Sequence, residues 1–154
     1  AEVERMGRDQ VSEVLESATV ENFAAAVPDA RTPFDWLSRD PEQVQLYAND
    51  PWCGYALCTG VWQDLIAAML VTTEASAVAA TLRRDLPIYI LSGSDDPVHG
   101  NWSAIERLEG NYRNCGLSDL TVKSYAGGRH EMFNETNRDE VVAGLLDWLG
   151  SRLS

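Results

Sequence analysis

The spacing of hydrophobic and polar residues divides the chain into two parts that meet near residue 84. Residues 1–83 combine helical spacings with proline-containing connections, whereas residues 84–154 alternate short apolar runs with amphipathic stretches. Short apolar runs favour buried strands, and apolar positions three or four residues apart favour helices. The pattern therefore predicts a helical region followed by a region in which strands and helices alternate.

The first part predicts four helices, over residues 9–15, 40–48, 61–71 and 76–82. The second of these has the clearest start, because Asp40 can accept a hydrogen bond from a free backbone N–H and Pro41 suits the first turn. Pro51 disfavours a helical conformation at Asp50, so this helix is expected to end before it. Residues 27–36 contain two prolines and predict an irregular connection.

The second part predicts two strands, over residues 87–91 and 120–125, and two helices, over residues 102–112 and from residue 137 onward. This alternation implies parallel strands joined by a crossover helix. The run at 87–91 is apolar throughout, which is typical of a strand buried on both faces. Two strands alone make a poor parallel sheet. We therefore expect an α/β fold whose sheet is completed by a segment outside this chain.

Charge and composition argue against several classes of function. The formal net charge is −12, which disfavours binding to nucleic acid or to an anionic membrane surface. There is no signal-peptide pattern at the N-terminus, and the most apolar stretch, residues 65–82, is too polar to span a bilayer. Three cysteines without a C-x-x-C spacing and two histidines disfavour a disulfide framework or a zinc site. These features predict a cytoplasmic protein without metal or cofactor.

Residues with catalytic potential follow both predicted strands. Asp96 lies in the loop over residues 92–98, and His130 lies in the loop over residues 127–131. The carboxyl ends of neighbouring parallel strands meet at one edge of a sheet, where ligand sites commonly form. An imidazole can take the proton of a serine hydroxyl, and a carboxylate can hold that imidazole in the required tautomer. Asp96 and His130 are therefore the candidate acid and base of a Ser-His-Asp hydrolase.

Ordinary interpretations of these loops stay open. An aspartate among Gly, Ser and Pro commonly forms a turn, and a loop histidine is commonly structural or solvated. His99 has no comparable context and is interpreted as a loop residue. No Gly-x-Ser-x-Gly segment occurs in the chain, and Ser94 lacks the flanking residues of a nucleophile elbow. The nucleophilic serine is thus expected outside this chain.

Three regions resemble the monoacylglycerol lipase and lysophospholipase-like α/β-hydrolases, also called serine aminopeptidase-like. Residues 86–98 (LPIYILSGSDDPV) resemble their acid segment, residues 127–135 (GGRHEMFNE) their histidine segment, and residues 31–40 with 50–55 their cap region. The resemblance implies that Asp96 is the triad acid, His130 the base and Glu135 a structural residue. It also implies that residues 1–83 form a helical cap with its connection, and residues 84–154 the C-terminal part of the hydrolase core.

The oxyanion segment and nucleophile elbow of that family lie upstream and have no counterpart here. The resemblance therefore implies an N-terminal half as partner, which is a cleaved product, a separate piece, or missing from a truncated product. The implied substrate is a carboxylic ester, above all a small apolar lipid monoester. Trp36, Trp62 and Met132 are the candidate substrate-binding residues, although packing of helices on the sheet is the commoner role of such side chains.

Two other functions stay open. A non-catalytic α/β module that binds a partner or a small ligand would keep Asp96 and His130 as relics of a triad. An intact small enzyme would instead use Ser92 or Ser94 as its nucleophile. A serine-reactive probe distinguishes the first alternative from the hydrolase, and replacement of each serine by alanine tests the second.

Overall fold

The structure is a computed structural model that describes residues 1–153. The first part of the chain contains helices only, in the order α1 (Glu2–Met6), α2 (Glu13–Ala18), α3 (Val20–Ala25), α4 (Pro41–Asn49), α5 (Thr59–Thr73) and α6 (Ala75–Thr81). The second part contains β1 (Ile88–Gly93), a 3₁₀ turn η1 (Pro97–His99), α7 (Ser103–Asn114), β2 (Leu120–Tyr125), a 3₁₀ turn η2 (Met132–Asn134) and α8 (Arg138–Leu153). The boundary between the two parts, predicted near residue 84, thus falls between α6 and β1. The division into a cap and a core stays a prediction.

Capping residues set several of these boundaries. The carboxylate of Asp40 accepts a hydrogen bond from the Glu42 N–H at 3.0 Å, and Asp50 is extended before Pro51, so α4 starts and ends as predicted. The helix predicted over residues 9–15 is wrong at its start. Ser12 caps α2 one turn later, and Val11 instead pairs with Cys58 in an isolated β-bridge.

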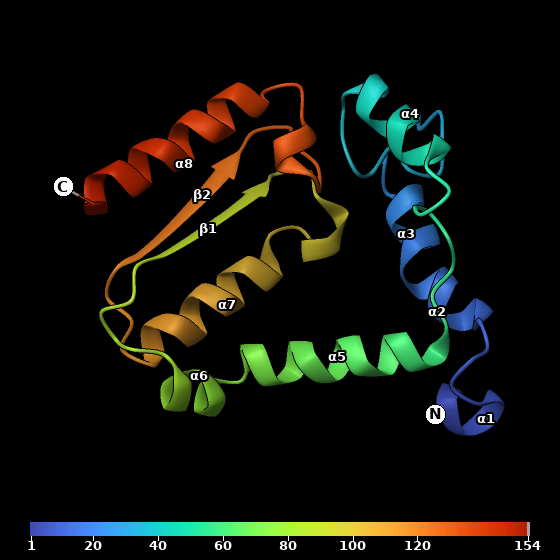
Figure 1. Cartoon of the computed structure of the whole chain (residues 1–154), viewed down its shortest axis with the longest axis horizontal. Helices are drawn as coiled ribbons and strands as arrows, with labels where there is room; N and C mark the ends of the chain where they lie inside the picture. Colours follow the sequence, from blue (N-terminus) through green and yellow to red (C-terminus); the bar gives the residue numbers. More distant parts are fainter. Residues whose placement is uncertain (154) are drawn as a thin grey trace.

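The two strands are parallel and in register from Ile88 beside Leu120 to Gly93 beside Tyr125. Helix α8 covers one face of the pair and α7 lies on the other (Figure 1). On the α8 face the indole of Trp148 donates to the hydroxyl of Thr121 at 3.0 Å. The two strands thus lie between a helix on each face, which is the local arrangement of an α/β protein.

Strand β1 was expected to be buried on both faces, and this expectation is wrong for most of its length. Only Ser92 and Gly93 are buried, while the four preceding residues are half-buried. The physical reason is that β2 pairs with one edge of β1 and no described strand pairs with the other, which leaves that side of β1 open. The buried cluster of the second part lies instead near the carboxyl ends of the strands, and consists of Tyr125, Met132 and Val141.

A second buried cluster lies in the helical part, where Val27, Trp36 and Leu37 pack against Phe23 and Tyr47. Helices α3 and α4 therefore stand beside the carboxyl ends of the strands, while α5 runs back below α7 toward α6 (Figure 1). Helix α5 is as apolar as predicted but poorly covered, with Met69 and Leu70 more than half exposed. Within residues 1–153 no single helix is long and apolar enough to cross a membrane, although α5 and α6 together, bent by 68°, satisfy the length and composition criteria.

Candidate active site

The loops that carry the two candidate residues leave the sheet at the same edge and are bound to each other. The Ser94 N–H donates to the Tyr125 carbonyl, and the Asp95 N–H donates to the Gly128 carbonyl, each at 2.9 Å. A Cβ atom at Gly93 would overlap the Gly128 carbonyl, so a side chain at this position would force the two backbones apart. The glycines thus allow the acid loop and the histidine loop to cross in direct contact.

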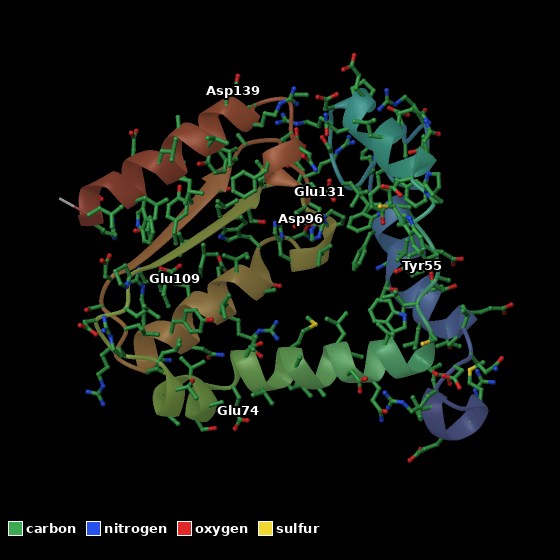
Figure 2. All side chains as sticks on the ribbon, viewed as in Figure 1. Tyr55, Glu74, Asp96, Glu109, Glu131 and Asp139 are labelled. Atoms are coloured by element: carbon green, nitrogen blue, oxygen red, sulfur yellow. The ribbon has the colours of Figure 1, made fainter. Side chains whose placement is uncertain are left out.

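Asp96 and His130 meet at this crossing. The Asp96 Oδ2 atom lies 3.0 Å from His130 Nδ1, and Asp96 Oδ1 accepts the Val98 N–H at 2.9 Å. The carboxylate is buried, whereas 40% of the His130 side chain is exposed. Figure 2 places Asp96, together with Glu131, at the end of the strands that faces α3 and α4. The predicted acid and base are therefore in contact.

The contact defines the tautomer of His130. An ionised carboxylate only accepts hydrogen bonds, so in the neutral imidazole Nδ1 carries the proton and Nε2 is the basic nitrogen. Within the described part of the chain, Nε2 has no hydrogen-bond partner. The arrangement leaves a basic nitrogen available to take a proton from a nucleophile.

The charges of the pair stabilise each other. The hydrogen bond that His130 donates to Asp96 raises the pKa of His130 above its usual value of 6.5, against the opposing effect of burial. Burial alone would raise the pKa of Asp96, but the hydrogen bonds from His130 and the Val98 N–H outweigh it, and the pKa lies below 3.8. Asp96 is thus a carboxylate at neutral pH, as an orienting acid must be.

A segment of the helical part fixes the histidine loop from the side. We call residues 35–39 the strap. The His130 N–H donates to the Trp36 carbonyl at 3.3 Å, and the Glu131 N–H donates to the Leu37 carbonyl at 2.8 Å. The Arg129 guanidinium donates to the Asp35 carbonyl at 2.6 Å. The backbone of the histidine loop is therefore held by a segment from the other part of the chain.

Glu135 anchors the strap and the histidine loop together. Its side chain is fully buried, and its carboxylate accepts hydrogen bonds from the N–H groups of Arg39, Arg129 and Thr136 and from the Arg39 guanidinium. Burial alone would raise the pKa of Glu135, but these donors hold it below the usual 4.5. The structural role that the resemblance implies for Glu135 agrees with these contacts.

The three candidate substrate-binding residues occupy different places. The ring of Trp36 lies beside that of His130, with centroids 5.1 Å apart. Met132 is buried beside Gly128 of the histidine loop and belongs to the buried cluster of the second part. Trp62 lies on α5 and lines a pocket of about 290 Å³ with residues of α1, α2 and α5. The structure brings Trp36 alone of these three against His130, and their roles in binding stay predictions.

Neither candidate serine within the chain is hydrogen-bonded to His130. Ser92 is buried in β1. The Ser94 hydroxyl donates to Asp95 at 2.7 Å and accepts the Gly127 N–H at 2.8 Å, so it serves to join the two loops. Among the described residues, Asp96 is the sole side chain hydrogen-bonded to the His130 ring. This placement disfavours an enzyme that would use Ser92 or Ser94.

Sequence reasoning missed two parts of the site. The strap contacts the histidine loop largely through backbone carbonyls, which have no signature in the sequence. His99, interpreted as a loop residue, is buried beside the acid loop with only 5% of its surface exposed. The available signal for a place in the site was its position in the sequence, three residues after Asp96.

Comparison with known proteins places the chain in a family. The sequence pattern of the family described as serine aminopeptidase, S33 matches residues 6–137. The chain is 29% identical to a monoacylglycerol lipase of Mycolicibacterium smegmatis over 152 residues, which cover 94% of this chain and 50% of the lipase.

Solved structures agree with the predicted fold. A thermostable carboxyl esterase from Bacillus coagulans matches with a TM-score of 0.79 and 23% identity, over 97% of this chain and 49% of the esterase. A lipase in its open form matches with a TM-score of 0.77 and 25% identity, over 93% of this chain and 46% of the lipase. The chain therefore spans about half the length of these relatives. Its helices and paired strands form part of an α/β-hydrolase fold, and the chain belongs to the serine aminopeptidase S33 family.

Proposed function

We propose that this chain is the part of a serine hydrolase that carries the acid and the histidine, and that the complete enzyme cleaves carboxylic esters. The contact between Asp96 and His130 at the carboxyl ends of two parallel strands carries this proposal. The nucleophilic serine and the oxyanion donors come from an N-terminal half outside this chain. The proposed location of the complete enzyme is the cytoplasm.

The proposed reaction gives His130 and Asp96 separate roles. His130 Nε2 takes the proton of the serine hydroxyl as its oxygen attacks the ester carbonyl, and Asp96 stabilises the imidazolium that forms. The imidazolium then donates this proton to the leaving alcohol, and an acyl-enzyme remains. Water attacks the acyl-enzyme with His130 again as base, which releases the carboxylic acid and regenerates the serine.

Lipid monoesters are the proposed substrates. The Mycolicibacterium smegmatis relative is a monoacylglycerol lipase, which supports this class. The apolar ring of Trp36 beside the base suits an apolar acyl or alcohol group, and transfer of an acyl chain from water to such surroundings contributes about 0.8 kcal/mol per methylene.

Labelling with a fluorophosphonate probe tests the proposal and locates the serine. The protein that carries this chain is purified with everything that accompanies it, and the intact mass of each labelled polypeptide is measured. We expect label on a serine outside residues 1–154, and no label after replacement of His130 by alanine. Label on Ser92 or Ser94 would contradict the proposed location of the serine. A folded preparation that takes up no label would instead favour a non-catalytic binding module.

The pH dependence of the complete enzyme should follow the titration of His130. The base acts only when deprotonated, so kcat/KM should fall as the pH is lowered through the His130 pKa, which contact with Asp96 raises above 6.5. Replacement of Asp96 by asparagine removes the raising partner and should move this inflection to lower pH. Steady-state kinetics with a soluble ester give the profile, and a flat profile between about pH 5 and 8 would contradict the role of His130.

A further inference from the structure

A buried histidine that the reaction does not use lies directly behind the acid loop. The His99 Nε2 atom lies 2.8 Å from the Gly93 carbonyl oxygen, and Nδ1 accepts the Trp102 N–H at 2.9 Å. A backbone N–H can only donate, so Nδ1 is unprotonated and Nε2 carries the proton. Both nitrogens of His99 therefore bond to the backbone, with Nε2 donating and Nδ1 accepting.

The carbonyl that His99 binds is also a carbonyl that fixes Asp96. The Asp96 N–H donates to the same Gly93 oxygen at 3.4 Å. The Gly93 carbonyl oxygen is thus the common acceptor for the His99 ring and for the backbone of Asp96. Gly93 in turn packs on Gly128, two residues before His130. A shift of this carbonyl would move the acid relative to the base.

His99 also holds an unfavourable backbone turn at the start of α7. Asn101 and Trp102 both have positive φ angles, of 52° and 74°, which residues with a Cβ rarely adopt. Such conformations persist only where surrounding contacts impose them. The bond from the Trp102 N–H to His99 Nδ1 is one such contact, and it joins α7 to the acid loop.

We propose that His99 is a positioning residue for Asp96, with its Nε2–H bond to the Gly93 carbonyl holding the carboxylate at the distance at which it orients His130. This proposal rests on the proposed roles of Asp96 and His130. Its test uses a titration as well as turnover, so that the two proposals can fail separately.

Three substitutions separate the two bonds of His99. Glutamine places an amide N–H near the position of Nε2 and preserves the bond to Gly93. Asparagine places an amide oxygen near the position of Nδ1 and preserves the bond from Trp102. Leucine preserves neither, and Asp96→Asn shows the His130 pKa without its carboxylate partner.

The main readout is the pKa of His130, measured by NMR in the protein that carries this chain and assigned with the His130→Ala variant. We expect the wild type to titrate above 6.5, His99→Gln to stay near the wild-type pKa, and His99→Asn and His99→Leu to move toward the Asp96→Asn pKa. In the complete enzyme, the asparagine and leucine variants should lose kcat on the order of 10²-fold with little change in KM. Thermal unfolding of each variant is measured in parallel.

A purely structural role for His99 would lower the unfolding temperature of the asparagine and leucine variants without moving the His130 pKa, and that result would overturn the proposal. Should the leucine variant not fold, the glutamine and asparagine pair gives the same comparison. A wild-type His130 pKa no higher than that of Asp96→Asn would overturn this proposal, because no effect of the carboxylate would remain for His99 to maintain. A raised wild-type pKa in a protein without esterase activity would overturn the hydrolase proposal alone, and the variants would still test His99.

Discussion

Replacement of His130 by alanine in the complete enzyme is expected to lower kcat on the order of 10⁴- to 10⁶-fold while leaving the fold intact. The side chain is 40% exposed and its ring bonds to Asp96 alone among the described residues, so its loss removes the base without opening a core. The serine hydroxyl then has no group to take its proton. Single-turnover kinetics with an ester substrate, together with thermal unfolding, measure both quantities.

The acid loop contains a matched control for this experiment. Asp95 is the exposed neighbour of Asp96, and its carboxylate accepts the Ser94 hydroxyl without contact to the base. Replacement of Asp96 by asparagine should lower kcat on the order of 10⁴-fold, because the amide favours the wrong imidazole tautomer. Asp95→Asn should retain kcat close to wild type. Equal losses for the two variants would contradict the assignment of Asp96 as the orienting acid.

Replacement of Glu135 by alanine is expected to lower the free energy of unfolding by roughly 3–5 kcal/mol. The substitution leaves the Arg39 guanidinium and three backbone N–H groups without their acceptor in a buried setting. Urea denaturation measures the loss. The surface pair of Glu109 with Arg113 provides the control, since Glu109→Ala should cost less than about 1 kcal/mol.

The stability contributed by Glu135 should also depend on pH. Its folded-state pKa lies below the usual 4.5, so the stabilisation is fully present above that value and is lost as the pH falls through the folded-state pKa. The difference in unfolding free energy between the wild type and Glu135→Gln should therefore narrow under acidic conditions. A difference that stays constant down to low pH would mean that the charge of Glu135 does not contribute.

Local signals in the sequence predicted the parts of the fold that depend on neighbouring residues. The strand over residues 120–125 and the start of α4 at Pro41 agree with the structure, since the pattern of the strand (LTVKSY) and an Asp-Pro cap both act over a few residues. The spacing of Val11, Val14 and Leu15 also fits a helix, but Val11 pairs with Cys58 far along the chain. Pairing between residues far apart in the chain overrides the local spacing, and the residues next to Val11 give no signal of it.

The candidate site divides in the same way. Asp96 and His130 could be predicted to meet because strand order and loop position place both at one edge of the sheet. The contact of the strap with the histidine loop could not be predicted. Asp35 and Arg129 are 94 positions apart, and the group that Arg129 binds is a backbone carbonyl. His99 lies in the connection between β1 and α7, as expected of a loop residue, but its burial could not be predicted because its partners are backbone groups, of Gly93 and Trp102.

The strap has a mechanical consequence for the helices that follow it. Backbone hydrogen bonds and the carboxylate of Glu135 join residues 35–39 to the histidine loop. This stretch is therefore fixed relative to the sheet. A movement of α4 or α5 relative to the sheet would therefore have to bend the chain outside residues 35–39, and it would leave the hydrogen bonds between this stretch and the histidine loop in place.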